Sequence, residues 1–277
     1  MEGNRPVAHG TDIRGSGAAQ TVVRAADLLG AIGRAREVSF SELARATGLA
    51  NPTLRRLLVS LIETGLVTQD RMRGRYRLGP ETYALGQLAR PAHGFHEVAR
   101  DSLATLAERS GDTAFLSALD GFSTVCLHRE EGRYPIRTHV LNVSDRHPLG
   151  LGAASLAILA ALPEAEAHRI LSVNADRIHA RFPEIEIARL EALVTEARPT
   201  GVALNPGLVF PGSWGIAAAV RAPTGEVVGA LTIAAIESRM TPDRQAELSA
   251  PLLAEARRIE KLMAQFGAAG PFLAAAE

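Results

Sequence analysis

The sequence predicts an α+β fold in two domains, an N-terminal winged helix-turn-helix and a C-terminal domain whose antiparallel sheet is flanked by helices. Three observations predict it. Residues 39–79 contain two helix signatures followed by two short strands. The segment PAHG at 91–94 then interrupts the alternation of helices and strands. Residues 95–266 follow the order helix, strands, helices, strands, helix. That last order is typical of an α+β domain.

Cap signals define the two helices of the helix-turn-helix. Ser39 and Glu42 have the spacing of a capping box, which satisfies backbone N–H groups at a helix start. Gly48 would end this helix, and Asn51 would cap the next one, with Pro52 at its first helical position. The apolar residues of the second helix recur at i, i+3, i+4 and i+7: Leu54, Leu57, Leu58 and Leu61. This second helix therefore has one apolar side.

The opposite side of this helix and the hairpin after it carry the expected DNA-binding residues. The residues off the leucine stripe are Pro52, Thr53, Arg55, Arg56, Val59 and Ser60. Strands at 66–68 and 75–78 enclose an arginine-bearing turn, with Arg71, Arg73 and Arg75 in or beside it. With the helix in the major groove, Thr53 and Arg55 would reach base edges, while Arg56 and the wing arginines would hold phosphate. The alternative is a small helical bundle with a solvated basic face.

Binding to double-stranded DNA also predicts a homodimer. One recognition helix contacts only a few base pairs, so a near-palindromic operator needs two helices related by a two-fold axis. The candidate dimer contacts are the helices expected at 20–36 and 81–90. Their Val22, Leu29, Tyr83 and Leu88 would otherwise all have to be buried in a very small domain.

Composition and charge favour a cytoplasmic DNA-binding protein. The chain has 277 residues, 47% hydrophobic and 22% charged, and a single cysteine, Cys126, which excludes an internal disulfide. No apolar run approaches the ~20 residues of a membrane span, and no secretory pattern opens the chain. Residues 1–79 carry 12 arginines against 7 acidic residues, whereas residues 80–277 carry 18 basic against 23 acidic residues. A basic head on an acidic body suits a nucleic-acid binder with a separate regulatory domain.

The expected boundaries follow from composition and periodicity. Residues 1–19 form a tail, residues 20–79 the DNA-binding domain, and residues 80–94 a linker helix and hinge. Residues 95–267 form the second domain, and residues 268–277 a C-terminal tail. In the first helix, over 20–36, the apolar residues at helical spacing are Val22, Ala25, Leu29 and Ile32.

The second domain is expected to begin with a helix over 95–110. Strands are expected at 113–119, 124–128, 135–140, 214–221 and 227–236, with a turn at 205–207. Further helices are expected within 149–162 and over 164–180 and 184–198. A closing helix would start at a Thr241 cap with Pro242 at its first position.

A candidate effector site lies where a glycine-containing loop enters the helix at 149–162. Free N–H groups at a helix start bind a carboxylate, and glycine allows close approach. The alternative is a loop that needs glycine only for packing. Asn205, Trp214 and Thr232 would add an amide, an aromatic wall and a hydroxyl, although Trp214 could equally fill the core. The full candidate set is Leu149, Gly150, Gly152, Ala153, Ala154, Ser155, Asn205, Trp214, Gly215, Thr232 and Ala234. Its expected ligand is a small organic acid, aromatic or short-chain.

Catalytic and metal-binding patterns are not recognisable. Ser155, His128, His139, His147 and Asp145 could supply a nucleophile, a base and an orienting group, but no G-x-S-x-G elbow is present. Cys126 with these histidines has the ingredients of a zinc site without a recognisable ligand spacing. We therefore expect no catalytic residues, no cofactor and no metal. A ligand-independent architectural DNA-binding protein remains the main alternative, and an enzyme fused to a DNA-binding domain a weaker one.

Several segments together resemble the IclR family of bacterial transcriptional regulators, over about residues 20–266. They are GLANPTLRRLLVSLIETGLV, RGRYRLG, LGQLA, HPLGLGAASLAILAALP and WGIAAAV…GEVVGALTIAAIESRMT. The resemblance implies a C-terminal effector domain related to the GAF and PAS folds, with the loop before Ser155 as the effector loop. It also implies dimers that pair through the DNA-binding domains and often assemble as dimers of dimers.

Three departures from the family pattern matter. Pro52-Thr53 stands where many members have Ser-Thr, Gly215 stands where many have a cysteine, and Gly-Leu-Gly at 150–152 replaces His-Ala-Thr. The operator sequence and the effector therefore cannot be transferred from other members.

Overall fold

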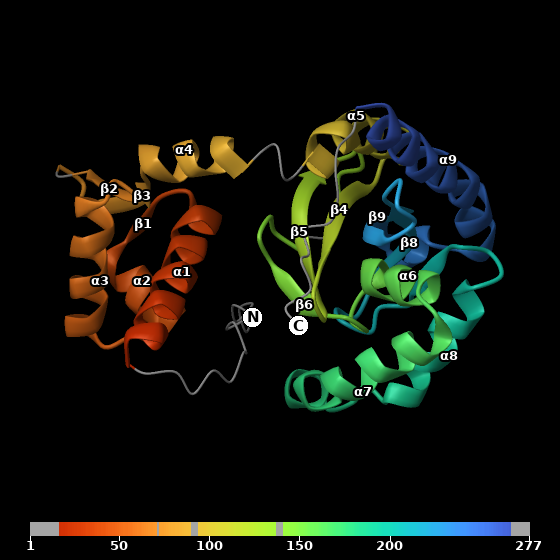
Figure 1. The fold of residues 1–277 in the computed structure, drawn as a ribbon, viewed down its shortest axis with the longest axis horizontal. Coiled ribbons are helices and arrows are strands. Elements are labelled where there is room, and N and C mark those ends of the chain that lie inside the picture. The colour runs from red at the N-terminus through yellow and green to blue at the C-terminus, as the bar shows by residue number, and fades with distance from the viewer. Residues whose placement is uncertain (1–16, 71, 90–93, 137–140, 267–277) are drawn as a thin grey trace. The chain divides into compact units, whose positions relative to one another are not determined.

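The computed structural model describes residues 17–70, 72–89, 94–136 and 141–266, and the chain divides into two compact units, residues 1–90 and 91–277 (Figure 1). The predicted tails lie largely outside the described residues, as do residues 91–93 of the predicted hinge and Arg71 of the predicted wing. The predicted α+β class is confirmed. Within the described parts of the chain, no helix combines the length and the apolar character needed to cross a membrane.

The N-terminal unit is a small helical domain with a three-stranded antiparallel sheet in the order β1-β3-β2. Its elements are α1 (Gly17–Ala35), β1 (Val38–Ser39), α2 (Phe40–Thr47), α3 (Asn51–Glu63), β2 (Val67–Asp70), β3 (Arg75–Leu78) and α4 (Pro80–Ala89). Its core combines the leucine stripe of α3 with residues from α1, α2 and the sheet. The fully or nearly buried members are Leu28, Ile32, Val38, Leu43, Leu54, Leu57, Leu58, Leu61, Val67 and Tyr76.

Local signals account for most of these boundaries. Ser39 and Glu42 form the predicted capping box, and Gly48 ends α2 at φ 65°, in the left-handed region that glycine tolerates. The predicted cap at Asn51 is wrong, because Ala50 precedes the first helical residue and no side chain caps α3. The predicted stripe of α1 is wrong in part. Leu28 and Ile32 are fully buried, whereas Val22 is 69% exposed.

The C-terminal unit is a six-stranded antiparallel sheet in the order β6-β5-β4-β9-β8-β7. Its strands are β4 (Thr113–Asp120), β5 (Ser123–Glu130), β6 (Arg146–Pro148), β7 (Ala203–Asn205), β8 (Ser213–Arg221) and β9 (Val227–Ile236). Its helices are α5 (Gly94–Ser110), α6 (Ala153–Ala161), α7 (Glu164–Arg181), α8 (Ile187–Ala197) and α9 (Pro242–Phe266), with a 3₁₀ turn at Glu237–Arg239.

The two faces of this sheet bury separate hydrophobic cores (Figure 1). On one face, α5 and α9 pack side by side over residues such as Leu116, Ile216 and Ile233. On the other, α6 lies against β8 and β9, and α8 packs behind it. The candidate site lies on the α6 side, where the start of α6 meets the sheet.

Two short edge strands differ from the sequence-based expectation. No strand forms at residues 135–136, and residues 137–140 lie outside the described part of the chain. On the side of β5 away from β4, the neighbouring strand is β6. Asn205 ends β7, which pairs with β8, so the predicted turn begins one residue later. Strands of three residues are too short to show a period of two, which explains why β6 and β7 were not predicted.

Candidate DNA-binding surface and effector pocket

The predicted recognition helix presents its basic side to solvent. Pro52, Arg55 and Arg56 are exposed and Thr53 is half-buried, while the leucine stripe faces the core. The guanidinium of Arg55 lies 5.6 Å from the centroid of the Phe40 ring, a cation–π contact that orients its stem. The first turn of α3 therefore offers a hydroxyl and two guanidinium groups within reach of a nucleic acid.

The wing is the hairpin of β2 and β3. Its turn is held by Asp70, whose Oδ1 accepts hydrogen bonds from the N–H groups of Met72 (2.9 Å) and Arg73 (3.1 Å). Gly74 completes the turn at φ 64°. Arg73 is exposed at the tip, and Arg77, which the sequence analysis did not select, is exposed on β3.

Arg75, a predicted phosphate contact, makes contacts within the N-terminal unit. Its guanidinium donates to the Glu37 carbonyl oxygen (3.1 Å) and lies 3.5 Å from the Glu42 carboxylate. Hydrogen bonds from Ser39, and secondarily the charge of Arg75, lower the pKa of Glu42. Arg75 thus ties the wing to the start of α2 and positions the hairpin.

The C-terminal unit contains a cavity at the start of α6, with about 570 Å³ of space between its walls, open solvent at its mouth included. Eight of the predicted effector residues line it: Gly152, Ala153, Ala154, Asn205, Trp214, Gly215, Thr232 and Ala234. The lining residues that the sequence analysis did not select are Phe115, Ser117, Thr124, Leu141, His147, Leu151, Val209, Phe210 and Ser213.

The remaining three predicted residues lie behind the wall. Leu149 is fully buried in the core, and the Ser155 hydroxyl lies 3.3 Å from the hydroxyl of Thr124. Gly150 has φ 116°, and a Cβ there would approach the Leu171 side chain to 2.9 Å. For Gly150, the packing role is therefore the one the structure supports.

Three buried polar atoms that have no hydrogen-bond partner in the described structure belong to residues lining this cavity. They are His147 Nδ1, Asn205 Oδ1 and Thr232 Oγ1, in side chains at least nine-tenths buried. A buried polar group without a partner costs about 1–3 kcal/mol. A polar ligand would recover that cost.

The start of α6 adds backbone donors to the same wall. Gly152 precedes the helix at φ 84°, and no side chain caps it. The N–H groups of the first turn have no partner within the helix, and they lie at the positive end of its dipole. Burial, and then the charge of Arg181, lowers the pKa of His147 to about 4. His147 is therefore neutral at pH 7 and can accept or donate one hydrogen bond through Nδ1.

The rest of the wall is largely apolar, apart from the hydroxyl residues Ser117, Thr124 and Ser213. Phe115, Phe210 and Trp214 supply aromatic surfaces, and alanines from α6 and β9 keep the space between them open. Gly215 contributes to this space, since a Cβ there would lie 3.5 Å from the Cβ of Ala153. The cavity suits a small ligand with an apolar body and a few polar atoms.

Among the described residues, the structure does not bring together the catalytic or zinc-binding groups that the sequence analysis considered. His128 contacts His96 and Glu130, and His139 lies outside the described residues. Burial raises the pKa of the Cys126 thiol to about 12, so this thiol is neither a nucleophile nor a ready metal ligand. In the described parts of the chain, no three histidine, cysteine or carboxylate side chains converge as a metal site.

A helix-turn-helix with a basic wing, joined to a domain with a largely apolar cavity, is typical of a DNA-binding regulator. Residues 91–261 match the bacterial transcriptional regulator IclR C-terminal domain, and residues 21–71 match the IclR helix-turn-helix domain. The chain belongs to the IclR family of bacterial transcriptional regulators.

Individual relatives agree with this assignment. The HTH-type transcriptional regulator BhcR of Paracoccus denitrificans is 28% identical over 262 residues, 93% of this chain and 92% of BhcR. The crystal structure of an IclR transcriptional regulator from Silicibacter sp. TM1040 superposes with a TM-score of 0.67 at 29% identity, covering 91% of this chain and 98% of that one. An IclR homologue from Microbacterium hydrocarbonoxydans, solved with 4-hydroxybenzoate, shares the fold with a TM-score of 0.68 at 20% identity, covering 88% of this chain and 99% of that one.

Proposed function

We propose that this regulator binds a near-palindromic operator as a homodimer, and that a small organic acid in the α6 cavity controls the binding. The observation that carries the proposal is the group of three buried, unpartnered polar atoms beside the uncapped start of α6. Leaving these polar atoms buried without hydrogen bonds costs free energy, and a polar ligand would pair with them.

The cavity favours a carboxylate with an apolar body. Among the described residues that line it there is no lysine or arginine, so we propose that an anion would be held by the first-turn N–H groups of α6 and by the Thr232 hydroxyl. The aromatic side chains of Phe115, Phe210 and Trp214 suit a flat ligand body. The 4-hydroxybenzoate bound by the Microbacterium homologue is of this chemical class and supports the proposal for this chain.

For the DNA, we propose that α3 lies in the major groove. Thr53 and Arg55 would contact base edges, and Arg56 and Arg73 would contact phosphate. Arg71, outside the described residues, stays a prediction as a phosphate contact, and Arg75 would act by positioning the wing.

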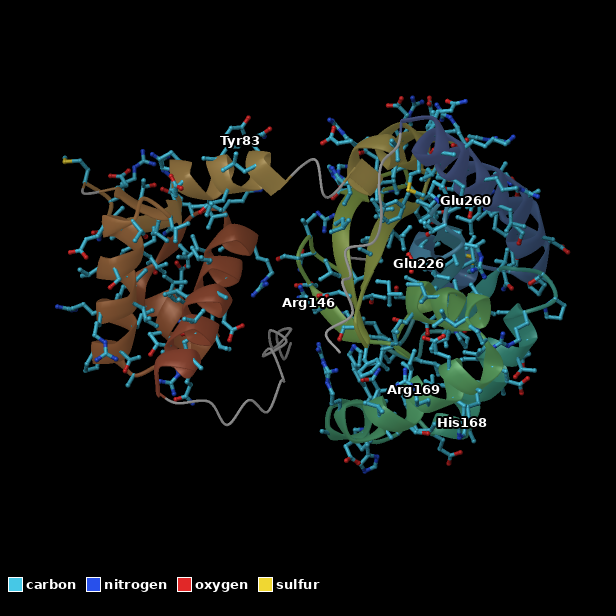
Figure 2. All side chains as sticks on the ribbon, viewed as in Figure 1. Tyr83, Arg146, His168, Arg169, Glu226 and Glu260 are labelled. Atoms are coloured by element: carbon cyan, nitrogen blue, oxygen red, sulfur yellow. The ribbon has the colours of Figure 1, made fainter. Side chains whose placement is uncertain are left out.

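The exposed apolar residues of α1 and α4 support the homodimer. Val22 is 69% exposed, Tyr83 72% and Leu88 78%, and Figure 2 shows Tyr83 on the outer side of α4. Large side chains exposed to this degree within one small unit favour an interface with a second copy. Further association into a dimer of dimers stays a prediction.

The test of the effector proposal is a thermal-shift screen with small aromatic and aliphatic carboxylates, followed by the fluorescence of Trp214, the only tryptophan. Ala154→Leu should fill the cavity and abolish the ligand response while operator binding persists, because Ala154 lines the cavity in the C-terminal unit. Ala254→Leu, at an exposed position of α9, is the matched control.

Two results would contradict the placement. One is an effector that leaves the emission of Trp214 unchanged and still acts on Ala154→Leu. The other is a protein that binds its operator fully and shows no thermal shift or fluorescence change with any carboxylate. That result would favour a ligand-independent architectural protein.

A further inference from the structure

Two histidines from separate elements face each other outside the effector cavity. His96 lies in the first turn of α5 and His128 in β5, and the Nε2 of His96 is 3.3 Å from the Nδ1 of His128. The ring centroids are 5.3 Å apart and the ring planes are tilted by 58°. Both side chains are partly open to solvent, at 31% and 25% exposure.

Each outer ring nitrogen faces a carboxylate. The Nδ1 of His96 lies 3.5 Å from Glu97, and the Nε2 of His128 lies 3.3 Å from Glu130. An ionised carboxylate only accepts hydrogen bonds, so it favours the tautomer with the proton on the outer nitrogen. In that state both inner nitrogens present lone pairs to each other, and they need a shared proton or a shared metal ion between them.

From this geometry we propose that His96 and His128 form an exchangeable zinc site that joins α5 to β5. Tetrahedral zinc with Zn–N bonds of about 2.0–2.1 Å places two imidazole nitrogens about 3.4 Å apart, which matches the observed 3.3 Å. A square-planar copper site would bring them to about 2.9 Å. The separation is therefore that expected for a tetrahedral ion such as zinc, and it is also a hydrogen-bond distance.

The surroundings fit a metal bound by imidazole. Metal-bound histidines usually donate their other N–H group to a carboxylate, as Glu97 and Glu130 allow here. The two carboxylates also balance the charge of a divalent cation, although Arg100 near His96 opposes it. Water would complete the coordination, because no group of three histidine, cysteine or carboxylate side chains converges here among the described residues. Binding is accordingly weaker than at a structural zinc site.

The experiment uses the full-length, tag-free protein after chelator treatment. Isothermal titration with zinc chloride should give one ion per chain. His96→Gln and His128→Gln should each weaken binding at least about tenfold, and Glu130→Gln by about tenfold or more. His168→Gln is the matched control, because His168 pairs with Glu191 at 2.7 Å on the surface of α7 (Figure 2) without a second imidazole.

Magnesium chloride should give no signal, because imidazole does not suit that ion. Circular dichroism would show that each variant is folded. The proposal is overturned if zinc binds equally well to the wild-type protein and to all variants. It is also overturned if about 100 µM zinc gives neither a binding signal nor a rise in the melting temperature, since even weak binding to the folded state would raise it. In the second case the two histidines share a proton only.

Discussion

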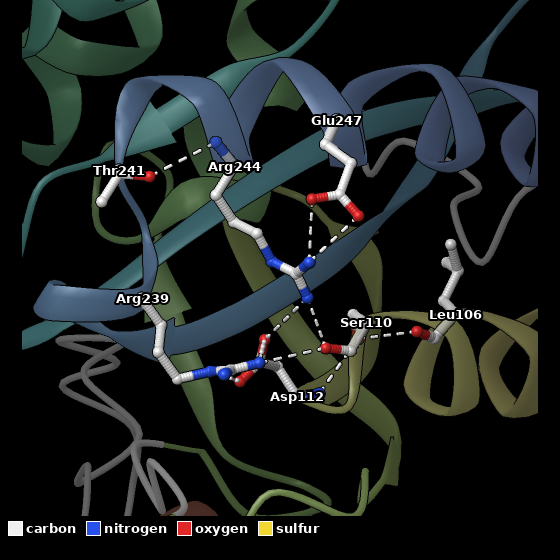
Figure 3. Close-up of polar contacts among 7 residues, drawn as sticks. All are labelled: Leu106, Ser110, Asp112, Arg239, Thr241, Arg244 and Glu247. Carbon is white, nitrogen blue, oxygen red and sulfur yellow. Dashed lines mark hydrogen bonds and ion pairs between the residues drawn. The ribbon is translucent and has the colours of Figure 1, made fainter.

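Replacing Asp112 by asparagine removes the negative charge that joins the start of β4 to the turn before α9. Asp112 is 95% buried, since only 5% of its surface is exposed, and it accepts hydrogen bonds from Arg239 at 2.9 and 3.0 Å. Arg244 lies 3.7 Å from the same carboxylate and donates to the carbonyl oxygen of Ser110 at 2.6 Å (Figure 3). The hydrogen bonds that Arg239 donates to the Asp112 carboxylate raise the pKa of the Arg239 guanidinium.

The expected cost follows from the burial of the two arginines. Removing one partner of a buried ion pair costs about 3–5 kcal/mol. Arg239 and Arg244 keep 26% and 23% of their side-chain surfaces exposed, so water can partly solvate them in the variant. We therefore expect Asp112→Asn to lower the free energy of unfolding of the C-terminal unit by about 3 kcal/mol, the lower end of that range. For a unit of this size, Tm should fall by about 6–12 °C.

Urea unfolding followed by Trp214 fluorescence measures this effect directly, because Trp214 lies in the C-terminal unit. The midpoint should fall with an unchanged m-value. Glu108→Gln is the matched control: Glu108 pairs with Arg133 at 3.3 Å, but their side chains are 71% and 86% exposed, so the loss should stay below about 1 kcal/mol. Equal losses in the two variants would refute the assignment of Asp112 as the centre of the network.

Three further predictions concern DNA binding, assembly and pH. Arg55→Ala should cost about 1–3 kcal/mol of binding free energy on the operator and relax discrimination at one base position. Arg73→Ala should weaken binding to all DNA sequences and lower the salt dependence of the affinity by about one unit of slope; fluorescence anisotropy measures both effects. If Arg55→Ala weakened binding to operator and random DNA equally, the proposed base contact would be contradicted. Leu88→Glu should give a monomer by light scattering and lose operator affinity, since Leu88 is 78% exposed on α4; an intact dimer would exclude α4 from the interface. Because burial lowers the pKa of His147 to about 4 from 6.5, the unfolded chain binds a proton that the folded chain does not, so the free energy of unfolding falls as pH decreases from 6.5 to 4. At pH 4.5 this histidine accounts for a loss of about 2–3 kcal/mol in the free energy of unfolding. The His147→Gln variant should not show this loss when urea unfolding is measured at several pH values.

The elements of the fold were predictable where local signals were strong. Capping residues, positive-φ glycines and apolar periods of 3.6 residues located α2, α3, α5 and α9, and the hairpin of β8 and β9 followed from its Pro-Thr-Gly turn. These signals are local, so they can be recognised in the sequence without knowledge of tertiary contacts. Where they compete with neighbours, as for Asn51 at the start of α3, the prediction was wrong by one residue.

The cavity was only half predictable, for a physical reason. Its floor comes from strands that are neighbours in the sheet but distant in sequence, such as Phe115 opposite Thr232 on β4 and β9. His147 carries an unpartnered polar atom of the cavity, yet in the sequence it is one histidine among eight. Only its place on β6, opposite Thr124, distinguishes it. The pair of His96 and His128 was hidden in the same way, since 32 positions separate them.

The two ends of α6 differ in a way that makes this helix suited to respond to a ligand. At its C-terminal end, Arg198 donates to the carbonyl oxygens of Ala160 (3.0 Å) and Leu162 (2.8 Å), and Arg221 donates to that of Ala161. These cations satisfy the negative end of the helix dipole, whereas the positive end at the cavity has no side-chain cap. Because residues 153–159 of α6 are buried, the helix cannot unwind or repack around a ligand at low cost. An anion at its start would therefore act on the position of the whole helix against the sheet and α8, and that displacement is what could carry a signal out of the cavity.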